Sequence, residues 1–140
     1  MKNKTNFGFT LIELLIVIAI IGVITSIVMV SVNVARGKAA NASVKQNLHG
    51  IGSQAEIFYD NNSGTYSDFC TDASVIPSLE GAGLAGSGVA TSTACFDSSA
   101  GWAAQARFKV QDSGGFTYWC VDNAGTAKGE TIPLAGSSCP

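Results

Sequence analysis

Apolar residues are concentrated in the first quarter of the chain. No charged residue falls between Glu13 and Arg36, and this uncharged stretch, residues 14–35, counts 22 residues. As a helix it spans about 33 Å, which is enough to cross a bilayer. The many Ile and Val residues suit a strand in water, but a lone strand in lipid leaves its backbone groups unpaired. The pattern therefore predicts a hydrophobic transmembrane helix over residues 9–35.

The apolar pattern continues with helical spacing beyond Arg36 but becomes one-sided. Its apolar members are Val44, Leu48, Ile51, Ala55 and Phe58. Polar residues fill the intervening positions, which predicts an amphipathic helix over residues 36–62. Asn and Gly at its end suit a left-handed cap. No proline interrupts residues 9–62, so either one long helix or two helices with a soft joint fit the pattern.

Alternation with a period of two begins further along the chain and is typical of β-strands. Residues 102–110 alternate as in a half-buried strand, and residues 116–121 and 126–132 predict two more, separated by Gly- and Asp-containing turns. We expect an α+β fold, in which the C-terminal half of the long helix packs on a small antiparallel sheet of three or four strands.

The segment between the helix and these strands is less regular. Residues 72–79 suit a short helix that Pro77 limits, and the Gly- and Ser-rich residues 80–93 predict a loop. The expected organisation is thus a polar leader (residues 1–8), two helical segments, and a globular region over residues 63–140.

Charge and cysteine content narrow the classes of function. The net charge is −2 with no basic cluster, which argues against strong electrostatic binding of nucleic acid. Four cysteines fall in the polar region: Cys70, Cys95, Cys120 and Cys139. An even number in a small Gly- and Ser-rich domain predicts two disulfides and an oxidising compartment. Wide spacings and a single histidine argue against zinc, so we expect no metal and no cofactor.

Glu13 is the most informative residue of the N-terminal region. A carboxylate at the edge of the hydrocarbon is costly and suggests a function, although a simple interfacial position is the alternative. A secretory signal does not explain it, because the apolar stretch is too long and lacks a small-residue cleavage site.

No set of side chains suggests catalysis. His49 lies on the polar side of the amphipathic helix without a nucleophile linked to it. Asp60, Asp68 and Asp72 lie close in sequence but do not form an ordered calcium loop. Trp102 is expected in the core, while Trp119 is equally compatible with core and surface. We expect a protein that is not an enzyme.

The residues from Lys2 to Val23 resemble the leader and first helix of type IV prepilins. The polar leader ends in Gly8, Phe9 follows, and Glu13 lies in the apolar sequence Phe-Thr-Leu-Ile-Glu-Leu-Leu-Ile. The resemblance implies cleavage between Gly8 and Phe9 by a prepilin peptidase, N-methylation of Phe9, and pairing of Glu13 with the Phe9 amine of a neighbouring subunit. A proline that many members carry about 20 residues after the cut is absent here.

The resemblance extends more weakly to the globular part. Members of the family commonly close a C-terminal loop with a disulfide, which Cys120 and Cys139 fit. Of the three pairings that four cysteines allow, we favour Cys70–Cys95 with Cys120–Cys139, because both loops are local.

These observations predict a structural subunit of a type IV pilus or related extracellular filament. Its partners would be copies of itself, the peptidase and methylase, and the inner-membrane assembly machinery, and nucleic acid only in a DNA-uptake pilus. A type II secretion pseudopilin is the alternative within the class, and a single-span anchored binding, adhesion or DNA-uptake domain is the alternative outside it. The charges flanking the span do not settle its orientation. The disulfides and the resemblance place the C-terminal domain outside the cytoplasmic membrane, and on the cell surface after assembly.

Overall fold

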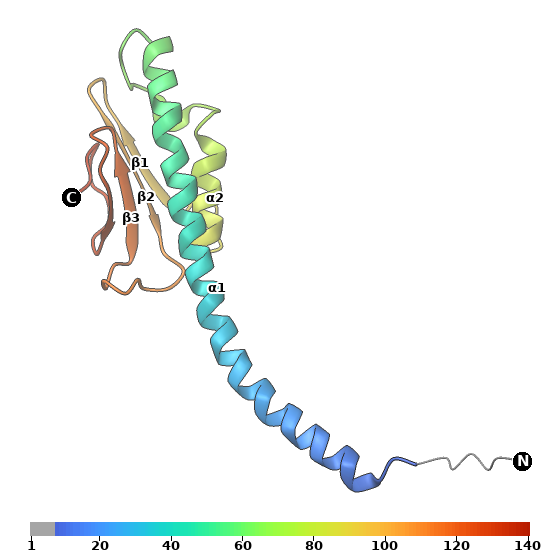
Figure 1. Ribbon diagram of the computed structural model, residues 1–140. Helices are drawn as coiled ribbons and strands as arrows, with labels where there is room; N and C mark the ends of the chain where they lie inside the picture. The colour runs from blue at the N-terminus through green and yellow to red at the C-terminus, as the bar shows by residue number, and fades with distance from the viewer. Residues whose placement is uncertain (1–7) are drawn as a thin grey trace, which may run out of the picture. The chain divides into compact units, whose positions relative to one another are not determined.

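A long helix followed by a small sheet forms the fold of the chain (Figure 1). The computed structural model describes residues 8–140, so the predicted leader, apart from Gly8, lies outside the described residues. The chain divides into two compact units, one ending at Ala35 and one comprising Arg36–Pro140, here called the outer unit. Helix α1 (Leu11–Asn61) is continuous. Of the two alternatives, one long helix or two helices with a soft joint, the first is therefore correct.

The N-terminal part of α1 has the properties of a membrane-spanning helix. It is long and apolar enough to cross a bilayer, and no residue of its most apolar window is buried within the chain. Its hydroxyl groups are satisfied inside the helix by bonds to preceding carbonyls, as lipid requires. The donors are Thr25, Ser26 and Ser31, and the acceptors are the carbonyls of Ile21, Val23 and Ile27.

The outer unit contains four strands and two short helical elements besides α1. The helical elements are η1 (Phe69–Thr71) and α2 (Ile76–Gly86). The strands are β1 (Thr93–Asp97), β2 (Trp102–Arg107), β3 (Tyr118–Asp122) and β4 (Ala127–Glu130). They form one sheet in the order β1-β2-β3-β4 with every neighbouring pair antiparallel, which confirms the predicted α+β architecture.

The helix expected within residues 72–79 is present as α2, but its bounds and the loop expected after it are wrong. The helix does not stop near Pro77, because that proline occupies the first turn, where it costs no hydrogen bond. Residues 80–86 are helical instead of looped, and their glycines permit close packing. A Cβ added at Gly86 would lie 1.8 Å from the Arg107 carbonyl oxygen. Strand β1, which begins at Thr93, was not predicted at all.

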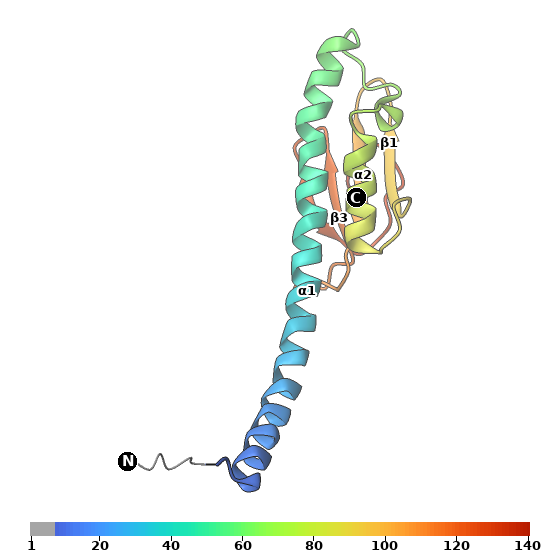
Figure 2. The ribbon, with the colours of Figure 1, turned by 90° about the vertical axis from the view of Figure 1, so that its right-hand side faces the viewer.

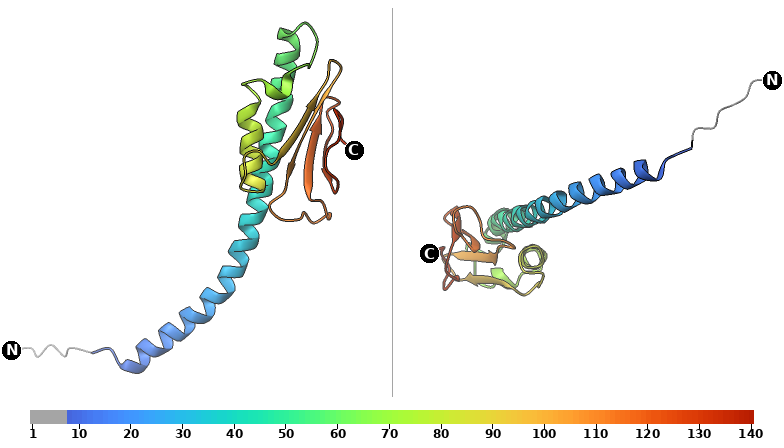
Figure 3. Two further views of the ribbon diagram at one scale, coloured as in Figure 1. Left: turned by 180° about the vertical axis from the view of Figure 1, so that it is seen from behind. Right: turned by 90° about the horizontal axis from the view of Figure 1, so that it is seen from below.

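One face of the sheet is covered by helices. The outer-unit part of α1 and all of α2 lie side by side on this face (Figures 2 and 3). The predicted apolar stripe of α1 is confirmed, since its first four members are fully buried and Phe58 packs against them. Trp102 is only 2% exposed and belongs to this core, as expected. Trp119 is half-buried and packs against this core.

The other face of the sheet is covered by the C-terminal segment, which corrects the expectation that β2 is half-buried. Ala103 and Cys120 pack there with Leu134. Gln105 is buried on this face as well, donating to the Ile132 carbonyl at 3.1 Å and accepting from the Leu134 N–H at 2.8 Å. A buried polar side chain thus fastens the tail to the sheet.

Candidate functional site

The segment that precedes α1 is accessible and not helical. Gly8, Phe9 and Thr10 are not helical, and all three are exposed. A Cβ added at Gly8 would meet nothing within 4 Å, so the packing of this chain does not require a glycine there. The Phe9 side chain is 80% exposed. The backbone on both sides of the bond between Gly8 and Phe9 is therefore accessible.

Glu13 and Thr10 form a capping box at the start of α1. The Glu13 Oε2 accepts from the backbone N–H of Thr10 and from its hydroxyl, both at 2.8 Å. In return, the Glu13 N–H donates to the Thr10 Oγ1 at 3.3 Å. Two backbone donors that the helix end leaves free are thus satisfied. The Thr-x-x-Glu spacing is visible in the sequence and could have identified Thr10, which the sequence reasoning missed.

The exposed apolar surface follows directly after this cap. Large apolar side chains from Leu11 to Val34 are exposed all around the helix. Exposure on this scale is not stable in water and requires lipid or other protein around the helix. Glu13 is the only charged side chain among residues 9–35. One carboxylate therefore lies at the end of a surface that must be covered.

The four cysteines lie far from this segment in sequence and form two disulfides in the outer unit. One joins Cys70 in η1 to Cys95 in β1, and the other joins Cys120 in β3 to Cys139 in the C-terminal segment. This is the local pairing favoured from the sequence. The first bond ties η1 to the sheet edge and the second holds the tail that covers the sheet.

Asp122 supports the second disulfide. Its carboxylate accepts backbone N–H bonds from Ala124 and Thr126 in the β3–β4 turn, and from Cys139, at 3.0 to 3.1 Å. Burial raises the pKa of Asp122, but these three donors outweigh burial, and the pKa lies below its ordinary value. The charged form is therefore the one that the fold stabilises.

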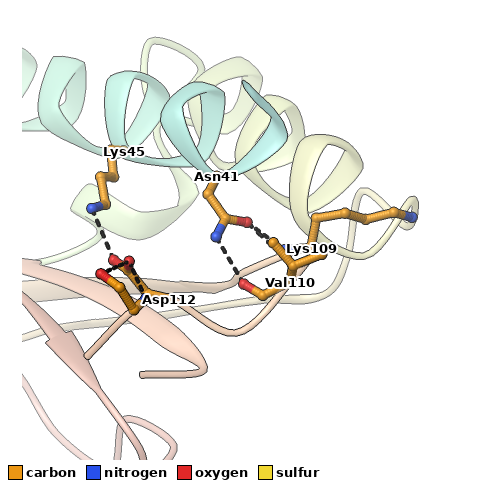
Figure 4. Close-up of polar contacts among 6 residues, drawn as sticks. Asn41, Lys45, Lys109, Val110 and Asp112 are labelled. Carbon is orange, nitrogen blue, oxygen red and sulfur yellow. Dashed lines mark hydrogen bonds and ion pairs between the residues drawn. The ribbon is translucent and has the colours of Figure 1, made fainter. Parts of the chain in front are cut away.

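The β2–β3 loop, residues 108–117, is fastened to α1 by a set of polar contacts (Figure 4). Asn41 donates to the Val110 carbonyl at 2.8 Å and accepts from the N–H groups of Lys109 and Val110 at 2.9 and 3.3 Å. Lys45 pairs with Asp112 at 3.3 Å and lies 4.3 Å from the ring centre of Trp119. We call these contacts the loop clamp.

The loop clamp also involves a glycine and a titratable group. A Cβ at Gly37 would lie 2.7 Å from a methyl carbon of Val110, so the close approach of helix and loop requires a glycine. The N–H of Ser113 and then the Lys45 ammonium hold the pKa of Asp112 below its ordinary value. The sequence reasoning named neither Gly37 nor Asn41 as a contact.

The remaining candidates form no catalytic or metal-binding arrangement. His49 is exposed and lines a cleft of about 180 Å³ with Trp102 and Asp122. Asp72 accepts from the N–H and hydroxyl of Ser74, which closes a local turn. Across residues 8–140, no three His, Cys, Asp or Glu side chains are grouped to hold a metal ion.

Comparison with known proteins adds two findings. Residues 3–29 match the family model described as the prokaryotic N-terminal methylation motif. The type IV major pilin protein PilA of Myxococcus xanthus (strain DK1622) is 33% identical over 75 residues, which cover 54% of this chain and 34% of the relative. The chain thus aligns with about a third of the length of that curated relative. No solved structure matches the chain.

Proposed function

Since the chain carries the N-terminal methylation motif of the type IV pilin family, a family of structural subunits and not of enzymes, we propose that it is the building unit of a type IV pilus. The observation that carries the proposal is the apolar surface of α1, which is exposed on all sides and begins at a single carboxylate. A surface of this kind is covered by lipid in a precursor and by copies of the same helix in a filament.

We propose that a prepilin peptidase first removes residues 1–8. The bond between Gly8 and Phe9 lies in exposed, non-helical backbone, which supports access by the enzyme. Cleavage creates an N-terminal ammonium at Phe9, four residues before Glu13 in the sequence. N-methylation of this amine keeps its positive charge available for an ion pair.

Glu13 then pairs with the Phe9 ammonium of a neighbouring subunit. Away from water each charge alone is costly, whereas a paired carboxylate and ammonium largely offset each other. In the monomer the Glu13 carboxylate is occupied by Thr10 on its own helix. One oxygen accepts both of those bonds, so the other oxygen is free to accept from a second donor.

The partners follow from this sequence of events. They are other copies of the chain, the peptidase that also methylates, and inner-membrane assembly proteins. Before assembly the chain lies in the cytoplasmic membrane with the outer unit outside, where the two disulfides are stable. After assembly it lies in a surface filament.

The filament fraction tests this proposal. Filaments sheared from cells should contain this protein as the bulk component, and its N-terminus should be N-methylated Phe9 by mass spectrometry. A processed protein that stays in the cell envelope would indicate a secretion pseudopilin instead. An uncut N-terminus at Met1 would contradict the proposal and favour an anchored binding domain.

A further inference from the structure

Basic side chains of the outer unit gather around the first residues of its part of α1 and the end of β2. Arg36, Lys38 and Lys45 lie in the first ten residues of this unit. Arg107 is the last residue of β2, and Lys109 follows in the β2–β3 loop. The loop clamp brings the two groups together, since Asn41 binds the backbone of residues 109 and 110.

Acidic side chains gather at the opposite end of the same unit. Asp97 and Asp122 lie where β1 and β3 pair with the first residues of β2, far along the strand from Arg107. Asp60 lies at the C-terminal end of α1, and Asp68 precedes η1, which contacts Trp102 through Phe69. The outer unit therefore has a basic and an acidic end, although the net charge of the chain is only −2.

Most cations of the basic end have no ion-pair partner. The two acids nearby are already used, because Asp112 pairs with Lys45 and Glu130 with Lys128. Within residues 8–140 no ion pair involves the other four cations, and all four are exposed. These four cations are Arg36, Lys38, Arg107 and Lys109.

A cleft at this end is lined by two cations and by polar side chains. It has a volume of about 390 Å³ and lies between the C-terminal end of α2 and the β2–β3 loop. Arg107, Lys109, Gln111, Thr117 and Ser87 line it. The backbone of Lys109 is held by Asn41 while its side chain points away from Asn41 (Figure 4). The two cations, which make no ion pair within residues 8–140, are suited to binding a phosphate group. The Gln111 amide and the two hydroxyl groups already donate to backbone carbonyls, so they shape the cleft.

Exposed apolar side chains lie in the same loop. Val110 is 39% exposed and Phe116 is 36% exposed. A surface that combines cations with exposed aliphatic and aromatic side chains is typical of segments that lie in the headgroup region of a membrane.

The position of this end along the chain supports a membrane partner. The uncharged stretch of α1 ends at Ala35, and Arg36 follows at once. Gly37, one residue further, already packs against Val110 of the loop. Only one helical residue thus separates the end of the span from the first contact with the loop.

We propose that the basic end of the outer unit is a docking surface for anionic phospholipid headgroups, with the cleft taking a headgroup phosphodiester. The inference rests on the membrane-anchored stage of the proposed function. Bound headgroups hold the outer unit against the membrane before assembly. Nucleic acid is the less suitable partner, because four cations on an otherwise acidic unit give a small footprint.

Amide hydrogen exchange of the mature chain, residues 9–140, in lipid nanodiscs tests this proposal. Backbone amides of residues 108–117 should exchange more slowly in phosphatidylglycerol discs than in phosphatidylcholine discs. A cation near an anionic surface contributes about a fivefold change in binding, so slowing should reach about fivefold per cation engaged. The difference should shrink as salt is raised, because exposed charges are screened.

Charge variants provide the controls. The double variant Arg107→Gln with Lys109→Gln should lose most of the difference between the two lipids. Gln54→Glu with Asn61→Asp changes the net charge equally but lies towards the acidic end, and should keep the difference. Arg107→Lys with Lys109→Arg, which retains both charges, should keep it as well.

Three results would overturn the inference. The first is equal exchange of residues 108–117 in the two lipids, and the second is a difference between the lipids in the Arg107→Gln, Lys109→Gln variant as large as in the unchanged chain. The third is full protection of these residues in phosphatidylcholine discs when free phosphate or a short DNA duplex is added. Failure of the chain to enter phosphatidylcholine discs would instead contradict the membrane stage of the proposed function. The two failures are thus distinguishable.

Discussion

Asn41 is the residue on which the attachment of the β2–β3 loop depends most. It is 7% exposed and satisfies one carbonyl and two N–H groups of the loop. Leaving buried backbone groups without partners costs about 1–3 kcal/mol. We therefore expect Asn41→Ala to lower the free energy of unfolding of the outer unit by about that amount. Thermal unfolding followed by circular dichroism measures it. Gln46→Ala, an exposed change on the same helix, is the control and should change little.

Asp122 should make the stability of the outer unit dependent on pH. Its folded pKa lies below the ordinary value near 3.8, so its contribution is fully present above that value. The contribution is lost as the pH falls through the folded pKa. Asp122→Asn places an N–H₂ group where an acceptor is needed and should cost about 1–3 kcal/mol at pH 7. Unfolding curves at pH 7 and pH 3 should show a smaller difference for Asp122→Asn than for the unchanged chain. An equal difference would show that other carboxylates cause the acid sensitivity.

Individual residues also show where sequence reasoning stopped short. The apolar stripe of α1 was traced back only to Val44, although the same spacing continues to Asn41 and Gly37. Both are buried, and they mark a polar contact and a close approach. Similarly, Thr10 completes a capping box whose spacing is plain in the sequence. Gln105 gave no such signal, because its partners lie in a tail about 30 residues further along the chain.

At the scale of elements, the periodicity of apolar residues predicted the helix and strands that bury a continuous apolar face. The outer-unit part of α1 and the strands β2 and β3 were predicted for this reason. Only the first part of α2 was predicted, because its second half is rich in glycine and alanine and contributes little apolar signal. β1 was not predicted, because it is a short strand directly after the Gly- and Ser-rich residues. The positions of α2 and β1 depend on contacts between backbones, such as that between Gly86 and the Arg107 carbonyl.

Substitution by alanine should change the free energy of unfolding in opposite directions at Gly86 and at Gly50. A Cβ at Gly86 would overlap the Arg107 carbonyl oxygen, so α2 must move away from β2. Gly86→Ala should lower the free energy of unfolding by about 1–3 kcal/mol or more. At Gly50, inside the outer-unit part of α1, a Cβ would meet nothing within 4 Å. Gly50→Ala should raise it by about 0.5–1 kcal/mol through helix propensity. Denaturant titration of both variants tests the contrast, and a stable Gly86→Ala protein would contradict the close packing of α2 on β2.

For the whole molecule, the outer unit and the apolar helix follow different physical rules. The outer unit buries its own core and closes it with two disulfides. The helix up to Ala35 buries nothing within the chain. The uncharged stretch of the sequence ends at Ala35, the last residue of the first unit. The structure of a single subunit does not contain the proposed partner of Glu13, because that partner is the Phe9 ammonium of another copy.

The most direct test of the account is filament growth by the Glu13→Gln variant. Glutamine also serves in a capping box, so the start of α1 should remain formed and cleavage after Gly8 should proceed. Only the charge is lost, which leaves the Phe9 ammonium of the neighbouring subunit unpaired at a cost of about 3–5 kcal/mol. Thr10→Ala is the matched control, because it weakens the cap but keeps the carboxylate. We predict that Glu13→Gln accumulates as a processed, membrane-held monomer with few or no sheared filaments, whereas Thr10→Ala still assembles. A normal filament yield from Glu13→Gln would contradict the account.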